Sequence, residues 1–329
     1  DTWYHVGSGD EKPGRTGFAH LFEHVMFMGS QNVPYGRFDQ SLEAAGADNN
    51  GSTTEDRTNY FESGPSNVVP LALWLDADRM GWLLPTMDQQ KLDAQRDVVK
   101  NERRQGVDNV PYGLADETIL AALYPRGHPY SWPVIGSMAD LSEASVDDVK
   151  EFFRMYYAPN NSTMVIAGDV RPDSVKTWVT KYFGGVPRNP NAPTRAQVSP
   201  VTLPKDTTLV LEDKVQLPRV FYTWPTMPAF HPDEAPLDHF ADILGGNESS
   251  RLYRRLVYEM QIAQDVTAYN QCGKLAGVFQ IIATPAPGHT PAEVAKVIDE
   301  EVQKALDTGL TEREVARAKN SRRAAFLDE

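Results

Sequence analysis

The sequence lacks several features that would each point to a particular class of protein. Cys272 is the only cysteine among 329 residues, so an internal disulfide and a cysteine-based metal cluster are both excluded. The net charge of -13 argues against a nucleic-acid partner, which would require a basic face. No apolar run approaches the roughly 20 residues that span a bilayer, and no signal peptide is visible. Peptides and small molecules remain as candidate ligands.

What the sequence does contain is typical of a folded chain with two domains. Hydrophobic residues make up 41% and charged residues 23% of it, and its length is enough for two separate cores. Strand-like and helix-like segments mix in both halves without strict alternation, which predicts an α+β fold. The chain opens on a strand-like pattern and closes on an uncapped helical pattern. We therefore expect it to be a piece of a longer polypeptide.

A proline-rich stretch divides the chain. Residues 187–205 contain five prolines and show no periodicity, which is typical of a linker. We predict a first domain over 1–190, a linker over 191–207 and a second domain over 208–329. Strands are predicted over 207–215, from the last residue of the linker onward, and over 219–225.

The predicted helix over residues 17–29 carries three titratable side chains on one face. His20, Glu23 and His24 stand at positions i, i+3 and i+4, which share a helix face. Two imidazoles one turn apart can bind one tetrahedral zinc ion, and a carboxylate beside them can take a proton from water. A pair of hydrogen-bonded core histidines with a salt-bridged glutamate is the alternative. The pattern alone leaves both open.

A zinc site of this kind needs a third protein ligand. In the helix predicted over 88–105, one stripe is formed by Leu92, Gln95, Val99 and Glu102. We therefore expect Glu102 to be an acid that faces the core, and such a charge must be paired or bound to a metal. A salt bridge from Glu102 to a neighbouring arginine explains the pattern equally well.

Three segments of the chain together resemble a known family. GRTGFAHLFEHVMFMGS, NGSTTEDRTNYF and QRDVVKNERRQ are similar, in this order and spacing, to the pitrilysin/insulinase family of metallopeptidases (peptidase family M16), whose inverted zinc motif is H-x-x-E-H. The resemblance implies two similar α/β-layered domains of the LuxS/MPP-like metallohydrolase type, the second incomplete at its C-terminus. It also implies a zinc metalloendopeptidase. A non-catalytic scaffold or partner subunit of the same fold, and a zinc hydrolase with a non-peptide substrate, are the alternatives.

The resemblance also assigns roles to individual residues. It makes His20, His24 and Glu102 the ligands of one zinc ion, and Glu23 the general base that activates water. Gln95 stands where the family often has an acid, and it is expected to form hydrogen bonds around the ligands.

A polar strand predicted over residues 50–63 matches the edge strand along which the family holds an extended substrate. The resemblance therefore makes the start of this strand the expected substrate-binding segment, with residues Asn50, Gly51, Ser52 and Thr53. An extended peptide that adds to such an edge is held by its backbone.

The resemblance further implies a partner. The family uses an arginine and a tyrosine from a second module to hold substrate near the zinc, and alignment puts Val257 and Gln264 at these two positions. We therefore expect this chain to be the zinc-bearing half only. Its partner would be a second module, in the same longer chain or in a separate subunit, or a second copy of the chain.

Overall fold

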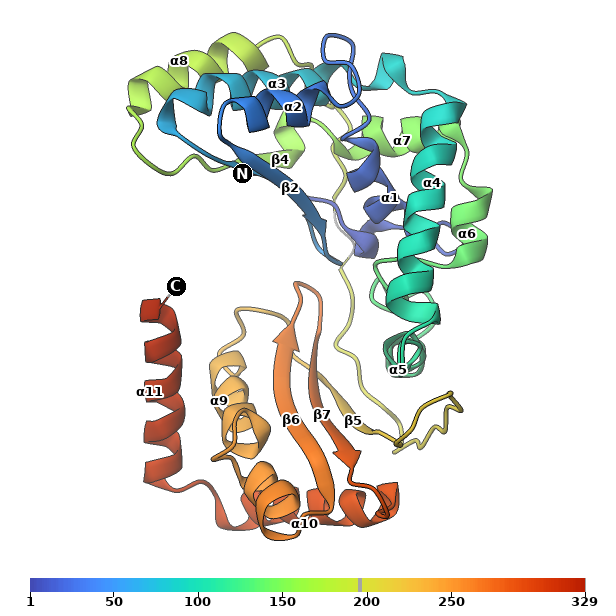
Figure 1. The fold of residues 1–329 in the computed structure, drawn as a ribbon, viewed down its shortest axis with the longest axis vertical. Coiled ribbons are helices and arrows are strands. Elements are labelled where there is room, and N and C mark those ends of the chain that lie inside the picture. Colours follow the sequence, from blue (N-terminus) through green and yellow to red (C-terminus); the bar gives the residue numbers. More distant parts are fainter. Residues whose placement is uncertain (195–196, 329) are drawn as a thin grey trace. The chain divides into compact units, whose positions relative to one another are not determined.

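The computed structural model describes residues 1–194 and 197–328, which divide into the units Asp1–Ala196 and Gln197–Glu329 (Figure 1). Residues 195 and 196, part of the linker predicted over 191–207, lie outside the described residues. Among the residues described, no helix is both long and apolar enough to cross a membrane. Each unit combines one antiparallel sheet with helices, in agreement with the predicted α+β class.

The first unit contains a four-stranded sheet with strand order β2-β3-β1-β4. Its strands are β1 (Thr2–Tyr4), β2 (Asp48–Thr53), β3 (Thr58–Ser63) and β4 (Ser162–Met164). Neighbouring strands are antiparallel, and β2 lies at one edge of the sheet. This edge lies beside helix α1 (Phe18–Val25), which carries the H-x-x-E-H motif.

The prediction of one strand over residues 50–63 was wrong, because these residues form most of the hairpin β2–β3. Strand β2 ends at Thr53, and Thr53 pairs with Thr58 across a four-residue turn. The hydroxyl of Thr54 accepts hydrogen bonds from the backbone N–H groups of Asp56 and Arg57, which stabilises the turn. Asp56 is a common turn residue, but the turn contains no glycine, proline or asparagine, so its signal in the sequence is weak.

Eight α-helices accompany this sheet in the described part of the first unit. Their bounds are α1 (Phe18–Val25), α2 (Arg37–Ala44), α3 (Val69–Trp82), α4 (Gln89–Arg103), α5 (Ala115–Leu123), α6 (Met138–Glu143), α7 (Val146–Tyr156) and α8 (Pro172–Phe183). Helix α1 packs against both β2 and α4 (Figure 1). Its buried side chains Leu21, Phe22 and Val25 belong to the main core of the unit. The opposite face of α1 is thereby turned away from the core.

The second unit contains a three-stranded sheet with strand order β5-β7-β6. Its strands are β5 (Val220–Thr226), β6 (Ala263–Cys272) and β7 (Gly277–Pro285), and its α-helices are α9 (Glu234–Gly245), α10 (Pro291–Thr308) and α11 (Glu312–Asp328). A core around Leu244, Ile281 and Ile298 joins the sheet to α9 and α10, and α11 packs against α9. Val257 lies partly buried against this core, whereas Gln264 is exposed on β6.

One strand predicted in the second unit does not form. Residues 207–215 adopt no regular element, and Leu209, Val210 and Leu211 are exposed. A strand is stable only when a neighbouring strand takes up its backbone hydrogen bonds, and no described strand pairs with this segment. Conversely, β6 was not predicted, because polar side chains dominate it and only small or medium apolar ones, such as Ala268 and Val266, are buried.

Candidate metal centre

Helix α1 begins at an unusual cap. Its N-cap residue is Gly17, which has a positive φ of 85° and no side chain that could accept from the exposed N–H groups of the first turn. Glu11 supplies the missing acceptor, because its two carboxylate oxygens accept from the backbone N–H groups of Gly17 (3.0 Å) and Ala19 (2.7 Å). Burial raises the pKa of Glu11, and these backbone hydrogen bonds oppose the rise.

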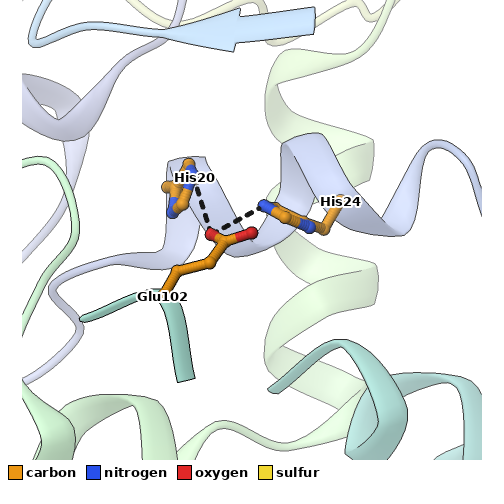
Figure 2. A group of neighbouring side chains, drawn as sticks. All are labelled: His20, His24 and Glu102. Carbon is orange, nitrogen blue, oxygen red and sulfur yellow. Dashed lines mark ion pairs between the residues drawn. The ribbon is translucent and has the colours of Figure 1, made fainter. Parts of the chain in front are cut away.

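The side chains of His20 and His24 on helix α1 meet that of Glu102, as Figure 2 shows. One ligand atom from each of His20, His24 and Glu102 lies within 4.8 Å of the others. The Oε2 atom of Glu102 lies 3.3 Å from Nε2 of His24 and 3.8 Å from Nε2 of His20. Two imidazole nitrogens and one carboxylate oxygen form a donor set that suits zinc and leaves a fourth position for water.

The protonation state of His20 also suits a metal. Burial, followed by the nearby charge of His24, lowers the pKa of His20 to about 4. His20 is therefore neutral at pH 7, the form in which imidazole binds a metal. Its Nδ1 atom is buried and has no hydrogen-bond partner among the described residues.

The structure corrects the reason for choosing Glu102. Leu92 and Val99 are fully buried, as the predicted stripe requires, but 42% of the Glu102 side chain is exposed. The adjacent Arg103 is the residue that turns inward, where it pairs with Glu117 and donates to the carbonyl of Gly136. Glu102 therefore does not face the core. Its carboxylate instead lies against the two histidines on α1.

Glu23 lies beside the three potential ligands and is held from strand β2. The hydroxyl of Thr53 donates a hydrogen bond of 2.5 Å to Oε2 of Glu23. A Cβ atom at Gly51 would lie 3.2 Å from both Cγ and Oε1 of Glu23, so glycine leaves room for this carboxylate. Burial raises the pKa of Glu23, while the hydrogen bond from Thr53 and the charge of His24 lower it. This carboxylate is well placed to exchange a proton.

A cavity of about 350 Å³ opens between this carboxylate and the sheet edge. Its lining residues are His20, Glu23, Gly51, Ser52, Thr53, Val134 and Ile135. The size lies at the lower end of the range for small-ligand pockets, about 300–1,000 Å³. Three of the four residues expected to bind substrate therefore line the same cavity as the potential ligand His20.

Two other residues with predicted roles lie apart from the cavity lining. Asn50 is exposed, and its side-chain oxygen accepts from the backbone N–H of Gly51 at 2.8 Å. The side-chain amide of Gln95 lies 2.8 Å from the sulfur of Met28. No sequence pattern marks Glu11, Val134 or Ile135, because only the folded chain brings them to the site.

Family models match both halves of the chain. Residues 2–136 match the family model described as insulinase (peptidase family M16), and residues 143–322 match the model described as the peptidase M16 inactive domain. All four residues of the candidate centre lie in the first match. The zinc protease PqqE of Helicobacter pylori is 31% identical over 99% of this chain and 73% of its own length.

Solved structures share the fold. The structure titled as a protease from Helicobacter pylori has a TM-score of 0.91 at 28% identity, over 99% of this chain and 78% of that chain. Pitrilysin, at 19% identity, has a TM-score of 0.73 over 95% of this chain and only 34% of its own. The arrangement of elements in this chain is therefore that of the M16 peptidases.

Proposed function

Because the chain belongs to the insulinase family of peptidases, M16, we propose that it is a zinc metalloendopeptidase with His20, His24 and Glu102 as the metal ligands. The observation that carries this proposal is the convergence of the three donor atoms within 4.8 Å from two separate helices. The curated relative is named a zinc protease, which agrees with the donor set. The match described as inactive begins at residue 143 and contains none of these residues.

In the proposed reaction Glu23 is the general base. Zinc, when bound, supplies a Lewis acid that polarises the scissile carbonyl and makes water acidic enough to ionise near pH 7. Glu23 accepts the proton of the attacking water and returns it to the leaving amine. Thr53 orients Glu23 through their hydrogen bond, so the carboxylate does not have to reorganise during the reaction.

We further propose that the substrate is a peptide held as an extended strand on β2. This strand lies at the edge of its sheet, so it has no neighbouring strand on one side among the described residues. Such an edge can pair with the backbone of an added peptide, largely regardless of side chains. Gly51, Ser52 and Thr53 lie at the cavity, and Asn50 precedes them at the exposed edge.

A second module that carries an arginine and a tyrosine is proposed as the partner. Val257 and Gln264 occupy the aligned positions in this chain, and neither can supply the charge or the phenol. The chain spans 73% of the length of its Helicobacter pylori relative and 34% of pitrilysin. The same longer protein or another subunit would supply this module, whereas a second copy of the chain would again bring Val257 and Gln264.

One experiment separates this function from its alternatives. The chain is compared with the double variant His20→Ala/His24→Ala for zinc content and for cleavage of unstructured peptides and matched esters. We expect one zinc per chain, chelator-sensitive peptide cleavage and neither property in the variant. Zinc without peptide cleavage, even with the second module added, would instead indicate a scaffold. Cleavage of esters alone would indicate a different zinc hydrolase.

A further inference from the structure

We infer that Glu11 is a positioning residue for the metal centre. Its buried carboxylate fixes the first turn of α1, and with it His20, relative to the β2–β3 hairpin. This role rests on the proposed metallopeptidase function. Glu11 itself lies outside the H-x-x-E-H motif and is 9% exposed.

The first step is the contact between Glu11 and helix α1. The two carboxylate oxygens of Glu11 each accept from a different backbone N–H, one of Gly17 and one of Ala19. Only a carboxylate offers two acceptor oxygens in this way, since a glutamine would turn an NH₂ group toward one of these donors. His20 follows Ala19 directly, so its backbone is fixed by this contact.

The second step is the anchoring of the segment that carries Glu11. Residues 7–11 bind to the turn of the hairpin, because the backbone N–H of Ser8 donates to Thr54 (3.1 Å) and that of Gly9 donates to Glu55 (2.8 Å). A Cβ atom at Gly7 would lie 2.3 Å from the carbonyl oxygen of Thr54, so the two chains are in close contact. Trp132 adds a hydrogen bond of 2.9 Å to the carbonyl of Ser8.

These two contacts connect both sides of the candidate centre. At one end, the segment holds the turn that follows Thr53, the hydrogen-bond donor to Glu23. At the other end, Glu11 holds the start of the helix that carries His20, Glu23 and His24. Metal ligands must be held within fractions of an ångström to bind zinc tightly. A small shift of α1 would therefore disturb the ligand geometry and the contact between Thr53 and Glu23 together.

The test compares two carboxylates that anchor the same loop. Glu11→Gln removes the second acceptor for α1. Asp140→Asn is the matched control, because Asp140 accepts from the backbone N–H (2.9 Å) and the hydroxyl (2.6 Å) of Thr16, one residue before Gly17. Zinc affinity is measured by chelator competition at a temperature at which all proteins are folded, together with the visible spectrum of the cobalt-substituted forms.

We expect both variants to unfold at lower temperature than the wild-type chain. Only Glu11→Gln should weaken zinc binding, by at least about tenfold, the lower end for loss of groups that orient metal ligands. Only this variant should also change the cobalt spectrum. The inference would be overturned if Glu11→Gln bound zinc as tightly as the wild type. It would also be overturned if Glu11→Gln and Asp140→Asn lost zinc affinity equally.

If Glu11→Gln does not fold, the variant Glu11→Asp tests the positioning role instead. Glu11→Asp keeps both oxygens on a side chain that is shorter by one methylene group, and we expect zinc binding weaker than in the wild type. Unchanged zinc affinity in Glu11→Asp would overturn the positioning role. Failure of the wild-type chain itself to bind zinc is a different result, because it would refute the proposed function as well.

Discussion

Thr53 and Glu23 are joined by a hydrogen bond of 2.5 Å between Oγ1 and Oε2, although they lie on a strand and a helix 30 residues apart. This contact connects the sheet edge proposed to hold substrate with the carboxylate proposed to take a proton. The edge and the base therefore keep a fixed relative position before any substrate arrives. Such preorganisation lowers the cost of reaching the transition state.

The first prediction concerns Glu23. Replacement by glutamine preserves the shape of the side chain and an oxygen that can accept from Thr53, but it removes the base. We expect Glu23→Gln to retain one zinc per chain while peptide cleavage falls by about 10²- to 10⁴-fold, the usual contribution of general acid–base catalysis. Metal content and turnover are measured on the same sample. Loss of zinc from the variant would show that Glu23 is a ligand.

The second prediction concerns Glu102. Glu102→Gln removes the only anionic donor of the proposed ligand set, so zinc affinity should fall by at least about tenfold to a hundredfold. Glu117→Gln is the control, because Glu117 pairs with Arg103 at 2.7 Å and takes no part in the set. Chelator competition gives both affinities. Normal zinc binding in Glu102→Gln combined with loss in Glu117→Gln would show that the third ligand was chosen wrongly.

The local part of this site could be predicted from the sequence. His20, Glu23 and His24 share a helix face because of their spacing alone. Glu102 was selected because it was expected to face the core, and this reason fails, since 42% of its side chain is exposed although Leu92 and Val99 on the same helix are fully buried. Its carboxylate lies against the histidines of helix α1 instead, a contact between two helices that the pattern of one helix does not record.

The features of the fold and of the site that could not be predicted depend on contacts between segments that are distant in the sequence. Glu11 meets the start of α1 because an irregular loop folds back, and no periodic pattern records such a loop. The hairpin β2–β3 has a turn made of ordinary polar residues, so it resembled one strand. The predicted strand over 207–215 has the right residues, but no strand among those described pairs with it. In each case tertiary context overrides the local pattern.

A third prediction concerns acid stability of the second unit. Hydrogen bonds from Arg251, together with those from the backbone and hydroxyl of Thr311, lower the pKa of Glu314 from 4.5 to about 2. A lowered pKa in the folded state stabilises the protein above the unfolded value and loses this effect as pH falls toward 2. We therefore expect the free energy of unfolding of the wild-type chain to decrease as the pH falls from about 5 to about 2. The decrease should be smaller in Glu314→Gln.

Urea unfolding followed by circular dichroism at several pH values measures this difference. The difference in unfolding free energy between the wild type and Glu314→Gln isolates one carboxylate from all the others that titrate in the same range. We expect it to be largest near neutral pH and to shrink toward pH 2. A difference that does not change with pH would contradict a lowered pKa at Glu314.

The fourth prediction concerns the isolated chain. Val257 and Gln264 stand in place of the arginine and tyrosine, so positioning and charge stabilisation near the scissile carbonyl are missing. We expect the purified chain to bind zinc but to cleave peptides with kcat/KM below about 10⁴ M⁻¹s⁻¹, the lower end for enzymes. Adding the second module should raise this value. Full turnover by the chain alone would refute the need for a partner.

The last prediction tests how the substrate is held. A peptide added to the edge of β2 would pair through its backbone, and in an extended strand successive N–H groups point to opposite sides. N-methylation of the peptide should therefore weaken binding at every second position and leave the positions between nearly unaffected. Each blocked hydrogen bond should cost about tenfold in affinity, since the partner carbonyl on β2 loses its donor.

The zinc-loaded Glu23→Gln variant makes this measurement possible, because it should bind the peptide without cutting it. Fluorescence anisotropy of labelled peptides, each methylated at one amide, gives the affinity position by position. A period of two in the losses would indicate strand addition, whereas losses at a single position would indicate one isolated contact. Equal affinity for all the methylated peptides would show that the protein holds its substrate by side chains, and that the open edge of β2 serves another purpose.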